Sequence, residues 1–313
     1  MWGPGLIKPL RETLGPLART ISGFEPVTVL VRESELQLAR HHCGDRVDLL
    51  VVPLDDCWIR DSGAVFVVGT DSAAAVDFNF NGWGNKQSHI HDSKVAGFMA
   101  DHAGQKRLNT DLVLEGGGIE VDGEGTAIIA ESCVLNPNRN PGLNKATCEF
   151  ELKRLLGIEK VIWLPGIAGR DITDGHTDFY ARFAQPGVVV AAIDDDPGSF
   201  DHNVTRRHLK ILESSLDARG RQLNITRLET PHSIRRRFDN NDFAAGYINF
   251  YVFNGAVILP EFGDRRRDND ARDKLKDHFP GREIIALNID PIAAGGEGIH
   301  CVTQQQPEFS LTG

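Results

Sequence analysis

The sequence contains no cysteine pair of the kind that marks a disulfide framework or a structural zinc site. Its five cysteines are odd in number, and no two of them are separated by two residues. Neither a disulfide framework nor a structural zinc site is therefore expected. We expect most of these thiols to be small buried apolar groups, so one or two at most need a chemical explanation.

Long apolar runs are also missing. No window approaches the ~20 consecutive apolar residues that a helix needs to cross a bilayer. The N-terminal stretch MWGPGLIKPLRETLG holds no apolar run of signal-peptide length. We therefore expect a cytoplasmic protein that does not associate with membranes.

Positive charge is scarce relative to negative charge. The chain has 34 Lys and Arg against 44 Asp and Glu, a formal net charge of -10. Its two short basic runs, 235–237 and 265–267, are each followed closely by an aspartate. Nucleic-acid binders usually carry a basic stripe, so we expect no nucleic-acid partner. An acidic surface favours a small cationic ligand through electrostatic steering.

The remaining composition is that of a soluble globular protein. Apolar residues make up 41% of the 313 residues, charged residues make up 25%, and the mean hydropathy is -0.26. This length suits one domain of α/β barrel or propeller type. We predict a single domain over residues 1–313.

A loosely repeated pattern runs along the chain, in which a polar or glycine-rich segment leads into two short strands joined by a turn. The five copies read DSGAVFVVGTDSAAAVDFNF, LEGGGIEVDGEGTAIIAES, DGHTDFYARFAQPGVVVAAI, AAGYINFYVFNGAVILPEFG and GGEGIHCVTQQQP. Equivalent starting positions lie 50 to 71 residues apart: Asp61, Glu115, His176, Tyr247 and Glu297. A period of this order is typical of radial repetition.

Helical patterns separate the copies, and each is followed by an apolar strand. We expect helices at 6–21, 149–156, 203–219 and 269–278, and strands at 27–31, 160–164, 223–228 and 283–287. The unit is therefore strand–strand–helix–strand. Five units predict an α/β fold, a five-bladed ββαβ propeller whose starting residues converge on a central site.

A doubly wound parallel sheet is the alternative fold. The turn sequences AQPG and FNGA favour hairpins, which require antiparallel neighbours. No glycine-rich phosphate loop follows the first strand, and Gly116–Gly118 precedes a strand rather than a helix. Both observations favour the propeller.

The segment DDCWIRD, residues 55–61, follows an apolar run and holds three carboxylates, a tryptophan and an arginine. Sites are commonly built where such ionisable groups follow a strand. The alternative is a solvated turn in which Arg60 pairs with Asp56. Trp58 favours a site, because an exposed indole in a loop often forms the wall of a binding pocket.

Two further segments offer acid–base groups. Glu115 precedes three glycines, which let a backbone approach a ligand closely, although a glutamate at a flexible turn is the alternative. In DGHTD, His176 and Asp178 would share one face if the segment opens a strand. As a metal pair they lack obvious further ligands, so we expect no metal. As an acid–base group and an anionic clamp they suit a thiol nucleophile.

Cys301 follows His300 in a glycine-rich, polar segment. A buried inert thiol is the usual fate of a single cysteine. A cysteine with distant histidine and acidic partners is instead a candidate nucleophile.

Taken together, these segments resemble the family of agmatine deiminases and Porphyromonas-type peptidylarginine deiminases, which belong to the guanidine-modifying enzymes. The matching text runs in order over residues 55–307: DDCWIRDSG, FNFNGWGNK, LEGGGIEVDGEGTAIIAESCVLNPNRNP, DGHTDFYARF, INFYVFNGAVILPEFGD and GGEGIHCVTQQQP. Each segment alone is weak evidence for the family, but the six segments in this order are specific to it. The resemblance implies the pentein fold, a five-bladed ββαβ propeller.

The resemblance also implies roles for individual residues: Cys301 as nucleophile, His176 as general acid and base, Asp61 and Asp178 as the guanidinium grip, Glu115 as a support for His176 or the substrate, and Trp58 as a pocket wall. The implied reaction hydrolyses a guanidinium through a covalent thiouronium, with agmatine and water giving N-carbamoylputrescine and ammonia. No cofactor is implied. Conversion of peptidylarginine or free arginine to citrulline is the alternative, ahead of an amidinotransferase or a non-catalytic binding protein.

Departures from the family pattern keep the substrate open. The family usually has an acidic run before its Gly-His, and here the text is GRDITDGH. Asp171 and Asp174 would suit an ammonium group, whereas Arg170 would suit a carboxylate on the substrate. The segment between Leu228 and Tyr247 is shorter than in agmatine deiminases, and their early Trp-Pro motif is absent. Whether the chain forms a homo-oligomer also stays open.

Overall fold

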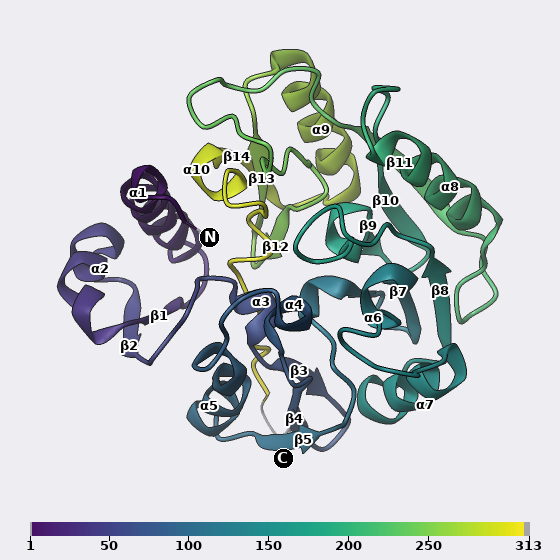
Figure 1. Ribbon diagram of the computed structural model, residues 1–313, viewed down its shortest axis with the longest axis horizontal. Coiled ribbons are helices and arrows are strands. Elements are labelled where there is room, and N and C mark those ends of the chain that lie inside the picture. Colours follow the sequence, from purple (N-terminus) through teal and green to yellow (C-terminus); the bar gives the residue numbers. More distant parts are fainter. Residues whose placement is uncertain (1, 310–313) are drawn as a thin grey trace. The chain divides into compact units, whose positions relative to one another are not determined.

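Figure 1 shows the protein as a computed structural model in which residues 2–309 are described. Its internal contacts divide the chain into two compact units. The first unit comprises Met1–Asp56 and Pro231–Ile299, and the second comprises Cys57–Thr230 and His300–Gly313. The single domain predicted over residues 1–313 stays a prediction, and its ends, residue 1 and residues 310–313, lie outside the described residues.

The second unit contains three sheets of three strands each. They are β3 (Val65–Val68), β4 (Ala73–Asp77) and β5 (Lys106–Asn109); β6 (Ile119–Val121), β7 (Thr126–Ala130) and β8 (Lys160–Leu164); and β9 (Ala181–Gln185), β10 (Val188–Ile193) and β11 (Asn224–Glu229). In each sheet the first two strands pair antiparallel and the third joins in parallel. The parallel crossover passes through a helix: α5 (Val95–His102), α7 (Lys145–Leu156) or α8 (Asp201–Ser214).

Successive sheets of the second unit share their hydrophobic cores. One cluster joins Val76 of β4 to Ile129 of β7 and Leu152 of α7, and a second joins Ile128 of β7 to Val189 of β10 and Leu212 of α8. Figure 1 shows α7 and α8 on the outer side of their sheets. Short loops and helical turns join the strands, and they carry the polar segments singled out in the sequence.

The helical turns are short. Three of them precede the first strand of a sheet: α3 (Ile59–Ser62), η3 (Gly116–Gly118) and η4 (Thr177–Phe179). The others lie in the crossovers: α4 (Gly82–Asn85), η2 (Asp92–Lys94) and α6 (Glu131–Val134). The segment DGHTD does not open a strand, which was the condition for His176 and Asp178 to share one face, because Thr177–Phe179 forms a 3₁₀ turn before β9 begins.

The first unit contains two sheets. Its elements are α1 (Pro4–Ile21), β1 (Thr28–Val31), η1 (Glu33–Glu35), α2 (Leu36–Cys43), β2 (Asp48–Val51), β12 (Tyr251–Phe253), β13 (Ala256–Glu261), α9 (Arg265–His278), β14 (Glu283–Asn288) and α10 (Asp290–Ala293). Strands β12, β13 and β14 repeat the ββαβ pattern, whereas β1 and β2 form a parallel pair. The hairpin predicted from FNGA is confirmed: Gly255 has φ +76°, which suits a two-residue Asn-Gly turn.

Helix boundaries follow local chemistry more than periodicity. Helix α7 begins earlier than predicted because the Asn144 side chain accepts a hydrogen bond from Thr147 N, and it ends as predicted at Gly157, which is left-handed. Helix α9 begins at Arg265 because Asp264 caps it in the same way. Helix α8 ends at Ser214, before the predicted end, and Asp217 then accepts from backbone amides in the following turn.

The repeat pattern is confirmed for four of the five predicted copies. The fifth is wrong as a strand pair, because within the described residues 295–307 contain no strand. The fifth sheet is β1–β2 near the start of the chain. No helix in the described part of the chain is long and apolar enough to cross a bilayer.

Candidate active site

Three predicted site residues of the second unit meet at Gly117 in η3. A Cβ atom placed on Gly117 would lie 2.7 Å from His176 Nδ1, 2.8 Å from Asp61 Oδ1 and 3.1 Å from Asp178 Oδ2. Real Cβ atoms do not approach so closely, so only glycine fits here. The backbone at Gly117 thus comes close to three site side chains, while its approach to a ligand stays a prediction.

Asp61 is held from two sides in the first turn of α3. Its Oδ1 accepts from Gly117 N at 3.0 Å, and its Oδ2 accepts from Trp83 Nε1 at 2.9 Å. His176 Nδ1 lies 3.7 Å from Oδ2. Burial raises the pKa of the Asp61 carboxyl, and the charge of His176 opposes that rise.

His176 lies between two carboxylates. Besides Asp61 near Nδ1, Glu115 Oε2 lies 3.2 Å from Nε2. Burial disfavours the charged ring, but Asp61, Cys133 and Glu115 raise the pKa of His176 well above its usual value. The imidazole is therefore held as a cation, which can donate a proton.

Glu115 is fully buried and stays ionised. Burial alone would raise its pKa, but the hydrogen bond from His176 and the charge of Arg139 lower it to about 2. Arg139 Nε donates to Glu115 Oε1 at 3.0 Å, so each oxygen of this carboxylate has a partner. Glu115 therefore contacts His176, and its role as a support for His176 or the substrate stays a prediction.

Cys301 lies beside Asp178, the other predicted guanidinium grip. Its sulfur is 3.6 Å from Asp178 Oδ2, and both residues are fully buried. His300 Nδ1 lies 2.7 Å from the same oxygen. Burial raises the pKa of Asp178 to about 6. The positive charge of His176 opposes this rise, and the negative charge of Asp61 adds to it.

The Cys301 segment is bound to the start of α3. Arg60 N donates to the carbonyl of Cys301 at 3.0 Å, and Arg60 Nε donates to the carbonyl of His300 at 3.2 Å. Arg60 therefore bonds to the nucleophile segment, and it is buried rather than solvated. Trp58 at the N-terminus of α3 is only 2% exposed, so the expectation of an exposed indole is wrong.

The loop before His176 holds three predicted substrate ligands. Asp174 Oδ2 accepts from Lys86 Nζ at 2.6 Å and also from Arg139, and its Oδ1 accepts from Gly169 N at 2.8 Å. Asp171 Oδ1 accepts from Thr173 N at 2.7 Å. Both carboxylates thus have protein partners, while Arg170 is exposed. Their contact with a substrate stays a prediction.

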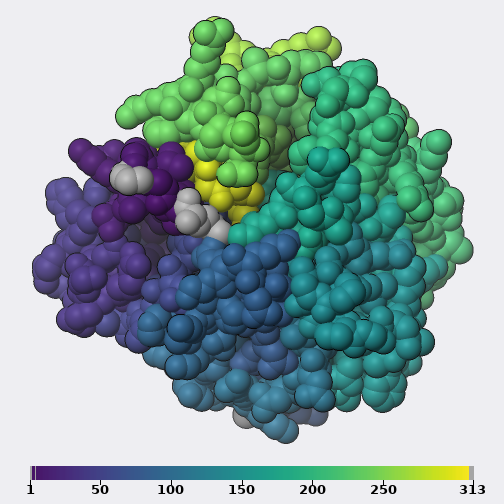
Figure 2. Space-filling view, viewed as in Figure 1, coloured from purple at the N-terminus to yellow at the C-terminus, as the bar shows by residue number. Residues whose placement is uncertain are grey.

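Lys86, in the segment after β4, bonds to the loop that precedes His176. Its ammonium also donates to the carbonyl of Ile172 at 2.9 Å. In Figure 2 blue and teal surfaces of the second unit lie against each other near the middle of the view. The loop that leads into His176 is therefore anchored rather than loose.

Sequence reasoning gave no role to three residues that contact the site: Trp83, Cys133 and Arg139. Each lies in text that matched the family, FNFNGWGNK or SCVLNPNRNP, so the motif was the available signal. Trp83 reaches Asp61 from a backbone with φ +54°, an uncommon value for a bulky residue. Only folding brings these segments together.

Glu115, Cys133 and His176 also offer three metal-ligand atoms within 4.8 Å of one another. A cation there would face the charged His176 ring and the guanidinium of Arg139. Burial and the charge of Glu115 raise the pKa of the Cys133 thiol to about 11, which opposes the thiolate that a metal needs. The donor set therefore fits an acid–base pair better than a metal centre.

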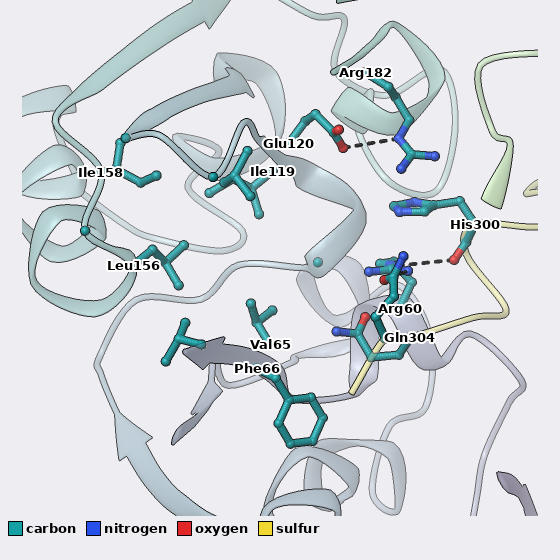
Figure 3. Close-up of a pocket in the computed structure, with 17 residues that line it drawn as sticks. Arg60, Val65, Phe66, Ile119, Glu120, Leu156, Ile158, Arg182, His300 and Gln304 are labelled. Atoms are coloured by element: carbon teal, nitrogen blue, oxygen red, sulfur yellow. Dashed lines mark hydrogen bonds and ion pairs between the residues drawn. The ribbon is translucent and has the colours of Figure 1, made fainter. Parts of the chain in front are cut away.

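His300 also lines a cavity of about 350 Å³, which Figure 3 shows. Its polar lining includes Arg60, Arg182 and Glu120, and Arg182 Nε lies 3.2 Å from Glu120 Oε2. The ring of His300 lies between the two arginines in this view. Much of the remaining lining is apolar, including Val65, Phe66, Ile119, Leu156 and Ile158.

Comparison with known proteins identifies the family. A sequence model of the Porphyromonas-type peptidyl-arginine deiminases matches residues 1–307. The chain belongs to this family. The chain is also 37% identical over 324 residues to the agmatine deiminase of Ectopseudomonas mendocina, covering 96% of this chain and 88% of the relative.

Solved structures give the same family and confirm the fold class. The agmatine deiminase of Enterococcus faecalis superposes with a TM-score of 0.91 at 32% identity, over 96% of this chain and 88% of that one. A C315S agmatine deiminase of C. jejuni with substrate bound superposes with a TM-score of 0.86 at 27% identity, over 97% and 88%. The α/β fold of ββαβ repeats predicted from the sequence is confirmed.

Proposed function

We propose that this chain is a hydrolytic deiminase that converts agmatine and water to N-carbamoylputrescine and ammonia. The observation that carries the proposal is the convergence of Asp61, His176 and Asp178 on Gly117, with the Cys301 sulfur 3.6 Å from Asp178. The relatives at 37% and 32% identity are named agmatine deiminases, which supports agmatine as the substrate.

The two carboxylates suit a guanidinium group. Asp61 and Asp178 would bind its N–H groups by charge-assisted hydrogen bonds and fix its central carbon beside the sulfur. Each carboxylate oxygen has two lone pairs, so the bond from Trp83 to Asp61 leaves acceptor capacity for a substrate. The cationic substrate next to the sulfur favours the thiolate, which is the nucleophilic form.

The first half of the reaction expels ammonia. The Cys301 thiolate forms a bond to the guanidinium carbon, giving a neutral tetrahedral adduct. Protonated His176 donates its proton to one NH₂ group, and the C–N bond breaks as ammonia leaves. A cationic thiouronium and a neutral imidazole remain. The paired carboxylates that keep His176 protonated thus prepare it to act first as an acid.

The second half consumes water. Neutral His176 takes a proton from water, and the hydroxide attacks the thiouronium carbon. The C–S bond then breaks, the Cys301 thiolate leaves, and the hydroxyl proton is lost as the ureido carbonyl forms. That proton converts the released ammonia to ammonium, so atoms and charge balance without any cofactor.

A citrulline-forming reaction on peptidylarginine or free arginine is the second candidate. The family name and the exposed Arg170 favour it, because an arginine can pair with a substrate carboxylate. An ammonia-release assay with agmatine, arginine and arginine-containing peptides side by side separates these substrates. Product analysis with an added amine acceptor would reveal an amidinotransferase.

The nucleophile is tested by Cys301→Ala, with Cys133→Ala as the matched control. We expect Cys301→Ala to lose turnover while still binding substrate, because the carboxylates remain. Cys133→Ala should keep a measurable though lower rate, because its thiol supports Glu115 and His176 and is not the proposed nucleophile. Normal turnover in Cys301→Ala would refute the mechanism.

We also propose a cytoplasmic location, because the five cysteines form no disulfide bond with one another, which suits a reducing compartment.

A further inference from the structure

We propose that His300 is the positioning residue of Asp178: its Nδ1–H group holds one carboxylate oxygen so that the carboxylate is oriented to grip a guanidinium beside Cys301. The inference rests on the proposed function and extends it to a residue that neither the sequence patterns nor the comparisons assign.

The contact itself is short and fully enclosed. His300 Nδ1 lies 2.7 Å from Asp178 Oδ2, and the two residues are 3% and 0% exposed. A carboxylate oxygen only accepts when ionised, so the proton of this bond belongs to Nδ1. Without such a bond the carboxylate plane could rotate, and the geometry of a two-point guanidinium grip would be lost.

His300 is suited to act as a neutral donor. Burial and the positive charges of Arg182 and Arg60 hold the pKa of His300 well below its usual value. A neutral ring protonated on Nδ1 donates to Asp178 without adding a full positive charge. The negative charge of Asp178 therefore remains for a cationic substrate.

The same short segment places both the donor and the nucleophile. Arg60 donates from Nε to the carbonyl of His300 and from its backbone N to the carbonyl of Cys301. Figure 3 shows Arg60 next to His300, with the hydrogen bond to its carbonyl. His300 thus sets the position of Asp178 relative to the sulfur that follows it in the chain.

The test compares two amides that each imitate one ring nitrogen. The amide nitrogen of His300→Asn lies near the position of Nδ1, and that of His300→Gln lies near Nε2. We expect His300→Asn to retain the KM of the unchanged protein within a few-fold. Loss of a hydrogen bond to a charged group in His300→Gln should raise KM roughly ten- to a hundredfold.

The pH profile supplies a readout that a merely structural role would not move. Asp178 faces His176, Asp61, Arg182 and Arg60 as well as His300. Removing the donated bond disfavours the ionised carboxylate, so the acid limb of kcat/KM should move up by about one to two pH units in His300→Gln. In His300→Asn it should stay in place. The exposed His102 provides control substitutions, His102→Asn and His102→Gln, which should leave the profile unchanged.

A second readout does not depend on turnover. Alkylation of Cys301 by 2-chloroacetamidine needs the carboxylate grip, whereas alkylation by neutral iodoacetamide does not. We expect the ratio of the two rates to fall about tenfold or more in His300→Gln and to be kept in His300→Asn.

The outcomes separate this inference from the proposed function. Equal losses in both His300 variants with an unshifted pH profile, or an unchanged KM and alkylation ratio in His300→Gln, would overturn the positioning role. If the unchanged protein releases no ammonia from any guanidine but alkylates preferentially with the amidine, the proposed function fails. The alkylation ratios of the two variants still decide the role of His300.

Discussion

At the scale of single residues, the site depends on the missing side chain of Gly117 as much as on the groups around it. Three polar atoms from Asp61, His176 and Asp178 lie within 3.1 Å of the place where a Cβ would stand. None of these atoms is the end of a long flexible side chain that could move aside cheaply. The absence of a side chain at Gly117 therefore allows Asp61, His176 and Asp178 to lie this close together.

Gly117→Ala should lower kcat/KM by roughly a hundredfold or more, because displacing positioned groups by about 1 Å costs that much. Steady-state kinetics, with thermal unfolding to show that the variant is folded, measure the effect. Gly69→Ala in the β3–β4 turn is the control, since its nearest neighbour lies at 3.5 Å. Near-normal kinetics in Gly117→Ala would show that the site is looser than the structure indicates.

Also at the residue scale, Asp178 should set the acid limit of activity. Its pKa is raised to about 6, so it is ionised above that pH and protonates below it. A protonated carboxyl cannot grip a cation, and kcat/KM should therefore fall as pH drops through about 6. A bound guanidinium favours the ionised form, so the limb of kcat should lie lower. A kcat/KM profile that stays flat down to pH 5 would contradict this assignment.

At the scale of elements, loops rather than strands carry the chemistry, and Arg139 ties them together. From the loop after α6 it donates to Glu115 before η3, and to Thr173 and Asp174 before η4. Its side chain is fully buried. Two carboxylates and a backbone carbonyl from different repeats thus share one guanidinium, which fixes the partner of His176.

Arg139→Gln should destabilise the protein by about 3–5 kcal/mol, because it leaves buried carboxylates without their cation. The same substitution should also raise the pKa of Glu115, because the charge and hydrogen bond of Arg139 lower that pKa in the unchanged protein. Urea unfolding measures the first effect. The half-exposed Arg221 pairs with Asp217 and Glu124, and Arg221→Gln as the control should destabilise the protein much less, because solvent screens an exposed ion pair. Equal losses in the two variants would show that burial of Arg139 contributes nothing.

At the scale of the whole molecule, repetition explains why catalytic residues come from distant parts of the sequence. Three of the five predicted starting positions, Asp61, Glu115 and His176, fall in the second unit and contact one another or the same glycine. Tyr247 lies in the first unit, where its hydroxyl donates to Asp268 at 2.8 Å. The starting positions of the second unit therefore cluster, whereas Tyr247 bonds to a neighbour within its own unit.

The sequence by itself determined the ββαβ repeat, the candidate nucleophile and its acidic and imidazole partners. Period, turn chemistry and residue type are local properties, and they are readable without a fold. The family motifs then tied those residues to guanidine chemistry.

The tertiary structure decided what local patterns could not. It placed a 3₁₀ turn at DGHTD, where a strand would have put His176 and Asp178 on one face, and it formed the fifth sheet from β1 and β2. It assigned Arg139 to Glu115, bound Asp174 to Lys86, and placed His300 against Asp178. These contacts join residues 24 to 122 positions apart. Their geometry depends on how loops meet once the sheets have packed, and no periodicity in the chain encodes that.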